Sequence, residues 1–290
     1  MVVGPPFNTL STDLTDINPK IGFIIQARMK SERLPGKVLI SMPIGSQETM
    51  LGLIVKQLES SQFTHKTVIA TSTNTENDAI TTWCSSQSIL FYRGDENDVL
   101  SRFIEITSTN KFDVVVRLTA DNPLLDIPIL DKTIQKHINS GNDYTCSTGL
   151  PLGMNVEIVS GGALLSLKNR SLNQADIEHV THYFKHNEGY NVETIAFFDA
   201  NQFEGVRTTV DYPSDYVVMS TVLSLRNSEL SGIDLIEFIL KEYPYLFTVN
   251  SVNHQKVQHT TLDSEISAGV ELLRKFDLPN AADKLEKGTS

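Results

Sequence analysis

The segment from Ile21 to Lys37 decides the fold, and it reads IGFIIQARMKSERLPGK. Its first five residues form an apolar run that is rich in β-branched side chains and too short for a helix, so they predict a buried β-strand. The polar part that follows places Arg28, Lys30 and Arg33, together with Lys37, within ten positions. Phosphate groups bind where backbone amides and Arg or Lys side chains converge, although this spacing fits a solvated basic turn equally well. The segment matches neither the P-loop nor the dinucleotide-binding glycine motif.

Short apolar runs alternate with segments of helical spacing after this first strand. We predict strands at 67–71, 89–92 and 113–118, and helices at 49–61, 76–86 and 99–107. Such alternation is typical of βαβ units and predicts an α/β fold with a mostly parallel sheet and helices on both faces. Ligands of these sheets bind beyond the carboxyl ends of the strands. The polar clusters that follow the strands are therefore expected at one edge: 26–37, 71–74, 93–98 and 117–121.

The second half of the chain is less regular. We predict strands at 155–159, 192–197, 208–210 and 246–249, and helices at 175–184, 215–226, from about 231 and near 264–276. No internal repeat or clear linker interrupts the sequence after residue 20. We therefore expect a flexible N-terminal arm at 1–20, one main domain at 21–230, and a C-terminal extension at 231–290 packed on the same domain.

Charge and cysteine content exclude several classes of protein. The chain has 24 Lys and Arg residues against 35 Asp and Glu residues, whereas a general nucleic-acid binder needs a basic surface. Its two cysteines, Cys84 and Cys146, lack metal-type spacing and favour a reducing compartment. No apolar run approaches the ~20 residues that span a bilayer, and residues 1–20 lack the pattern of a secretory signal. We expect a cytoplasmic protein without a nucleic-acid or membrane partner.

The exact amino-acid sequence of the first loop is more specific than its charge. Residues 24–39 resemble the signature of the cytidylyltransferases similar to the spore-coat polysaccharide biosynthesis enzyme, which are relatives of the CMP-sialate and CMP-ketodeoxyoctonate synthetases. Further landmarks of this family follow in order at 91–95, 98–102, 116–124, 153–157, 178–181 and 207–215. The resemblance covers residues 21–225. It implies the three-layer, Rossmann-like sheet of nucleotide-diphospho-sugar transferases, with a small β arm, and a homodimer paired through residues 149–162.

The resemblance also implies an activity: Mg²⁺-dependent transfer of CMP from CTP to a small anionic acceptor, with release of pyrophosphate, for surface polysaccharide biosynthesis. The implied nucleotide-binding residues follow the first four strands and are Gln26, Ala27, Arg28, Ser31, Arg33, Lys37, Thr71, Ser72, Arg93, Gly94 and Arg117. Among them, Arg28 and Lys37 would also be catalytic, because they would stabilise charge on the α-phosphate and the departing pyrophosphate. Simple turn chemistry explains Thr71 and Ser72 equally well.

Two carboxylates are the implied metal ligands and complete the catalytic set. Asp121 stands just past a predicted buried strand, and Asp211 occupies the position of the family's second metal carboxylate. Mg²⁺ prefers carboxylate oxygens combined with phosphates and retained waters. For Asp121, capping of the next turn is the structural alternative.

The implied acceptor pocket holds Asn155, Glu157, His179 and Arg207. His179 fits a general base and a polar core residue equally well, and Arg207 would also serve in an ion pair with Glu178. Three positions depart from the family pattern, and two of them fall in this pocket. Lys30 replaces a usual Gly, Asn155 a usual Asp and Ile177 a usual Arg, so the resemblance identifies the nucleotide but not the acceptor.

Two rival functions remain at this point. A glycosyltransferase that uses a nucleotide-sugar donor would carry Asp-x-Asp after a middle strand, whereas this chain has Asp95 and Asp98 at a different spacing. A catalytically silent dimeric relative acting as a binding protein would be expected to lack Lys37, Asp121 or Asp211, and the chain retains all three.

Overall fold

The computed structural model describes residues 19–227, 229–253 and 261–288. Its contacts divide the chain into two compact units, Met1–Val252 and Asn253–Ser290. The arm expected at residues 1–20 lies outside the described residues, except for Pro19 and Lys20. The expected division into a main domain that ends near residue 230 and an extension packed on it stays a prediction.

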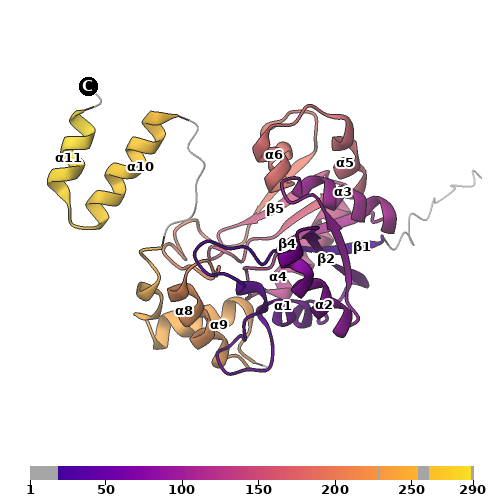
Figure 1. Ribbon diagram of the computed structural model, residues 1–290, viewed down its shortest axis with the longest axis horizontal. Coiled ribbons are helices and arrows are strands. Elements are labelled where there is room, and N and C mark those ends of the chain that lie inside the picture. The colour runs from indigo at the N-terminus through magenta and orange to yellow at the C-terminus, as the bar shows by residue number, and fades with distance from the viewer. Residues whose placement is uncertain (1–18, 228, 254–260, 289–290) are drawn as a thin grey trace, which may run out of the picture. The chain divides into compact units, whose positions relative to one another are not determined.

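A seven-stranded sheet runs through the first unit (Figure 1). The strands are β1 (Ile21–Gln26), β2 (His65–Ser72), β3 (Leu90–Gly94), β4 (Val114–Thr119), β5 (Tyr144–Thr148), β6 (Glu157–Ser160) and β7 (Val192–Ala196). Their order is β3-β2-β1-β4-β6-β5-β7. Strand β6 pairs antiparallel with β4 and β5, whereas the other pairings in this sheet are parallel. The mostly parallel α/β fold with a small antiparallel part is confirmed.

Helices lie on both sides of the sheet. In the first unit the α-helices are α1 (Met50–Leu58), α2 (Asp78–Ser86), α3 (Val99–Asn110), α4 (Ile127–Ser140), α5 (Gly161–Ser166), α6 (Gln174–His179), α7 (His182–His186), α8 (Pro213–Ser224) and α9 (Gly232–Glu242). Short 3₁₀ helices are η1 (Lys37–Leu39), η2 (Thr75–Asn77), η3 (Leu167–Asn169) and η4 (Leu246–Val249). The second unit contains α10 (Leu262–Lys275) and α11 (Pro279–Lys287). Thr49, Asp98 and Asp126 fix the starts of α1, α3 and α4, since each side chain accepts a hydrogen bond from an amide in the first turn.

Two apolar layers follow from the alternation of side chains along the strands. In β1, Phe23 and Ile25 enter one layer, which they share with residues of α1, α2, α4, α8 and α9. Ile24 enters the other layer, which it shares with residues of α3 and α5 and with Phe184 of α7. The central strands β1 and β4 are therefore buried along most of their length, and they place polar residues near their carboxyl ends.

Several local predictions from the sequence are wrong. Residues 208–210 form no strand, because Thr208 and Val210 donate their amides to the loop carbonyls of Leu152 and Asp121. Residues 246–249 form η4 instead of a strand. The helix expected at 175–184 is interrupted at Val180, whose φ of 56° is left-handed, and so divides into α6 and α7. In addition, α4, β5 and α11 were not predicted.

Among the described residues, we find no helix with the length and the apolar character needed to cross a membrane.

Candidate active site

The loop after β1 returns to the sheet and buries its last lysine. Gly36 has a left-handed φ of 71°, and its amide donates to the carbonyl of Met29 at 2.9 Å, which closes the loop. The Met29 amide in turn donates to Asn77 Oδ1 at 2.8 Å. As a result Lys37, at the start of η1, is only 7% exposed although it follows a polar loop.

Lys37 joins three segments that are far apart in the sequence. Its Nζ donates to Asp121 Oδ2 at 3.0 Å, to Asp211 Oδ1 at 2.9 Å and to the Val210 carbonyl at 2.8 Å. The three donors of the ammonium group are thereby used. The structure thus brings together three of the four residues predicted to be catalytic, with Asp121 just beyond the end of β4 and Asp211 just before α8.

Asp211 is surrounded by positive charge. Its Oδ1 also faces Arg33 Nη2 at 3.2 Å, and its Oδ2 accepts from Arg207 Nη2 at 2.7 Å. Arg207 Nε reaches Asp215 Oδ1 at 3.0 Å, and the Asp215 side chain is fully buried. Arg207, predicted as an acceptor residue, is therefore placed in a buried network that holds Asp211.

Asp121 is the more available of the two carboxylates. Its side chain is 32% exposed, against 9% for that of Asp211. Burial acts to raise the pKa of Asp121, but the Lys37 ammonium outweighs it, so this pKa lies below its usual value. Asp121 is therefore ionised at neutral pH.

This pair of carboxylates fits a divalent cation of the Mg²⁺ type. Both approach one point, the position of Lys37 Nζ, to within 3.0 Å, and both offer hard oxygen donors. In the part of the chain that the structure describes, no group of three or more His, Cys, Asp and Glu side chains is arranged to hold a metal. A cation at Asp121 and Asp211 would hence take its other ligands from phosphate and water, as Mg²⁺ commonly does.

A second polar cluster is centred on Glu157. Because β6 runs antiparallel to β4, its first residue, Glu157, lies opposite Arg117 near the end of β4. Arg117 Nη1 contacts Glu157 Oε2 at 2.5 Å, and its Nη2 is 3.4 Å from Gln26 Oε1. Lys185 Nζ, from α7, contacts Glu157 Oε1 at 2.5 Å. Arg117 and Gln26 are predicted to bind the nucleotide, and Glu157 is predicted to bind the acceptor. The structure thus brings residues of these two predicted groups into one cluster.

Electrostatics keep Glu157 ionised. Burial would raise its pKa, but Arg117 and Lys185 lower the pKa to about 2. Two hydroxyl groups also donate to this carboxylate: Tyr144 at 2.8 Å and Thr181 at 3.0 Å. Burial, with Glu157 adding to its effect, raises the pKa of Tyr144, so the hydroxyl remains a donor.

Residues predicted at the ends of β2 and β3 are held mainly by one another. Arg93 pairs with Asp78 at 2.7 Å and donates to the carbonyls of Ser72 and Asn74 at 3.0 and 2.9 Å. The Ser72 hydroxyl donates to Glu96. Arg93 thereby links the end of β2 to α2. These contacts give Arg93 a structural role.

Thr71, by contrast, is fully buried, and its hydroxyl has no hydrogen-bond partner within the described residues. A buried hydroxyl without a partner is unusual in a folded protein.

Other predicted residues lie near these clusters without joining them. Arg28, Asn155 and His179 are exposed, and the Ser31 hydroxyl accepts from the Leu34 amide at 3.4 Å. Ala27 is buried, and its amide continues the pairing of β1 with β2 by donating to Ala70. Partial burial lowers the pKa of His179, with Arg117 adding to the effect.

The sequence did not single out Lys185, Thr181, Tyr144 or Asp215 as functional residues. Thr181 was within reach of sequence reasoning, because it ends the family landmark at 178–181, whereas Lys185 belongs to no such landmark. Tyr144 was not, since the strand that carries it was missed.

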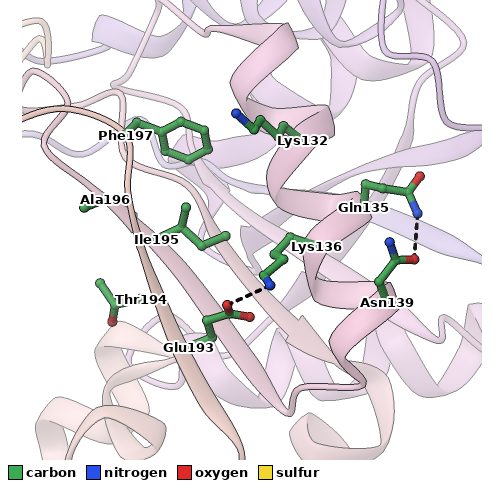
Figure 2. Close-up of a pocket in the computed structure, with 9 residues that line it drawn as sticks. All are labelled: Lys132, Gln135, Lys136, Asn139, Glu193, Thr194, Ile195, Ala196 and Phe197. Atoms are coloured by element: carbon green, nitrogen blue, oxygen red, sulfur yellow. Dashed lines mark hydrogen bonds and ion pairs between the residues drawn. The ribbon is translucent and has the colours of Figure 1, made fainter.

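A cavity of about 550 Å³ lies elsewhere, between α4 and the edge strand β7 (Figure 2). Lys132 and Lys136 of α4 face Phe197 and Glu193 across it, and Lys136 pairs with Glu193 at 3.3 Å (Figure 2). None of the predicted site residues lines this cavity. The polar clusters at the strand ends, not this cavity, therefore form the candidate active site.

Two sequence comparisons indicate the same family. A family model described as cytidylyltransferase matches residues 22–229. The spore coat polysaccharide biosynthesis protein SpsF of Bacillus subtilis (strain 168) is 38% identical over 200 residues, which cover 67% of this chain and 82% of SpsF.

Solved structures show the same architecture. A cytidylyltransferase from Leptospira borgpetersenii serovar Hardjo-bovis has a TM-score of 0.72 and 28% identity, covering 83% of this chain and 100% of that one. A CMP:2-keto-3-deoxy-manno-octonic acid synthetase complexed with CTP shares the fold with a TM-score of 0.54 and 13% identity, over 71% of this chain and 98% of its own. The chain belongs to the cytidylyltransferase family and is a nucleotidyltransferase.

Proposed function

We propose that this protein transfers CMP from CTP to a small anionic acceptor in a Mg²⁺-dependent reaction that releases pyrophosphate. The observation that carries the proposal is the contact of Lys37 with Asp121, just beyond β4, and with Asp211, just before α8. This contact joins a buried cation and two carboxylates in the region where ligands of such sheets bind. The CTP complex of the synthetase with the same fold supports CTP as the nucleotide.

The carboxylates would hold the metal and Lys37 would serve the phosphates. When bound, Mg²⁺ would neutralise phosphate charge and make the α-phosphorus a better electrophile. Lys37 can then turn its ammonium from the carboxylates to an oxygen of the triphosphate, where it stabilises charge on the departing pyrophosphate. Arg33 lies 3.2 Å from Asp211 and retains 31% exposure, so it can reach the same phosphates from the loop.

The acceptor would meet the cluster around Glu157. Arg117 and Lys185 flank this carboxylate, and the Lys185 side chain is 43% exposed, so a cation is available to an incoming carboxylate or phosphate. Such an acceptor is already an oxyanion and needs little base catalysis for in-line attack on the α-phosphorus. Asn155 and His179 are exposed nearby in the sequence and remain our candidates for acceptor contacts. The name of SpsF supports a role in surface polysaccharide biosynthesis.

Calorimetry with CTP, ATP, GTP and UTP, each with and without Mg²⁺, tests the nucleotide half of the proposal. We expect binding of CTP in preference to the other three, and only with the metal. Absence of CTP binding in the presence of Mg²⁺ would refute it. Pyrophosphate release with a panel of carboxylated and phosphorylated sugars then identifies the acceptor.

We further propose a cytoplasmic homodimer. The segment expected to pair the subunits, residues 149–162, includes Leu152, a large apolar side chain that is 43% exposed. Single exposed apolar side chains are also common on monomers, so the dimer proposal rests on the family resemblance of this segment. Light scattering during size-exclusion chromatography should give twice the monomer mass of 32.3 kDa, and a monomer mass at micromolar concentration would contradict this expectation.

A further inference from the structure

Arg102 is a buried charge that the described contacts leave uncompensated. It lies in the first turn of α3 and is only 5% exposed. Its Nε is wholly buried and has no hydrogen-bond partner, and no carboxylate of the described residues lies within the 4.0 Å of an ion pair. Buried arginines are almost always paired, because an unpaired buried charge costs considerable free energy. The fold therefore keeps a guanidinium that is stabilised by something other than these contacts.

The nearby carboxylates are engaged elsewhere. Asp98 caps α3 through the Ser101 amide at 2.8 Å, and Asp95 accepts from the Asn97 amide at 2.7 Å. Glu96 accepts from the hydroxyl of Ser72. These groups favour the charged form of Arg102 from a distance, but none of them forms an ion pair with it.

Arg102 lies at the edge of the sheet where the nucleotide is proposed to bind. Helix α3 follows β3, and the stem of Arg102 packs on Gly94, the last residue of that strand. A Cβ at Gly94 would lie 2.6 Å from Arg102 Cγ, too close for any other residue to fit without displacing the arginine. Gly94 thus makes room for Arg102.

A second guanidinium lies close enough to affect it. Burial lowers the pKa of Arg102, and the positive charge of Arg28 lowers it further. Arg28 belongs to the loop after β1 and is itself exposed without an ion pair among the residues that the structure describes. Two neighbouring guanidinium groups without carboxylate partners form a site that an anion with several oxygens would stabilise.

We propose that Arg102 binds a phosphate oxygen of the nucleotide, together with Arg28. The proposal rests on the proposed function, since it takes CTP as the ligand. Arg102 would be a nucleotide-binding residue that supplies a pre-positioned, desolvated cation. Its burial limits side-chain motion, so little conformational entropy is lost when the phosphate arrives.

The test uses Arg102→Met, which keeps most of the volume but removes the charge. A structural arginine and a ligand-binding arginine give opposite results. If Arg102 binds phosphate, the unliganded variant should unfold at the same temperature as the wild type or above it, because an uncompensated buried charge is gone. Its affinity for CTP with Mg²⁺ should fall by about 10- to 100-fold, the usual effect of losing a charged hydrogen bond.

Ligand fragments and two further variants complete the design. Pyrophosphate should stabilise the wild type but not Arg102→Met, whereas any response to cytidine should be equal in both. Arg226→Met is the matched control, since Arg226 is also partly buried but lies beyond the C-terminal end of α8, and its CTP affinity should equal that of the wild type. Arg102→Lys keeps the charge without the planar fork and should bind CTP with reduced affinity even if the Met variant fails to fold.

Three outcomes would overturn the inference. Unchanged CTP affinity in both Arg102 variants would show that the arginine is structural. If Arg102→Met weakened the response to cytidine but not the response to pyrophosphate, Arg102 would contact the base instead of the phosphates. If the wild type itself does not bind CTP, the proposed function fails, and the inference fails with it.

Discussion

Replacing Lys37 by Met should separate the structural role of its ammonium from the catalytic one. The substitution removes the cation that contacts Asp121 Oδ2 and Asp211 Oδ1 at 3.0 and 2.9 Å but keeps most of the side-chain volume. Losing one partner of a buried ion pair costs about 3–5 kcal/mol. Asp121 is 32% exposed, and Asp211 keeps Arg33 and Arg207, so we expect about 3 kcal/mol of lost unfolding free energy, the lower end of that range.

Mg²⁺ should restore this stability. In the variant the two carboxylates face each other without a cation between them, and a divalent ion can take that place, as a ligand that binds only the folded state. Urea unfolding with and without Mg²⁺ should show a metal-dependent gain in the Lys37→Met protein that exceeds the gain in the wild type. Turnover, in contrast, should stay about 10²–10³-fold below wild type with saturating metal, because the charge on the leaving pyrophosphate is no longer stabilised.

Two results would refute this reasoning. A variant as stable as the wild type without Mg²⁺ would show that the carboxylates do not depend on Lys37. A variant that loses stability but gains nothing from Mg²⁺ would show that Asp121 and Asp211 do not form a metal site.

Asp121→Asn should abolish turnover while the midpoint of urea unfolding changes little, and retained activity would contradict its role as a metal ligand. The pKa of Glu157 is lowered from 4.5 to about 2, so its carboxylate stabilises the fold by about 3 kcal/mol above pH 4.5. This stabilisation is lost as the pH falls toward 2. Glu157→Gln should therefore make the unfolding free energy nearly independent of pH in that window. His137 is buried, and its pKa is lowered from 6.5 to about 4, so the fold should lose about 3 kcal/mol as the pH falls from 6.5 to 4. His137→Gln should remove that loss, and an unchanged profile would place the pH dependence elsewhere.

The first half of the fold could be predicted because its local signals agree. The strand at Ile21–Gln26 and those that follow are short, apolar and β-branched, and they alternate with helical spacing. Helix α4 also carries readable signals, namely Asp126 as N-cap, Pro128 in the first turn and Gly141 as a left-handed C-cap. Its omission also concealed β5, the strand that follows it.

Segments that depend on long-range partners were less predictable. Residues 208–210 have the β-branched composition of a strand, but their backbone amides bond to the loops at Leu152 and Asp121. The break between α6 and α7 depends on one left-handed residue, Val180, whose β-branched side chain disfavours that conformation. No local sequence pattern predicts the absence of a strand at 208–210 or the break between α6 and α7.

The candidate site shows the same division. The residues of the first loop and Asp121 were expected at one sheet edge because each follows a strand. The resemblance alone added Asp211. The convergence of four donors on Glu157 could not be predicted, because it depends on the antiparallel direction of β6 and on a lysine, Lys185, from a helix that the sequence did not separate.

The close packing of Gly94 against Arg102 has a consequence for the history of the sequence. Because no side chain fits at 94 while the arginine stem occupies its place, position 94 cannot change freely as long as Arg102 is kept. A chain of this fold that has lost the arginine is released from the requirement for glycine, whereas one that keeps the arginine is not. The two positions should therefore vary together, and a variant carrying Gly94→Ala should tolerate that change far better when Arg102 is replaced as well.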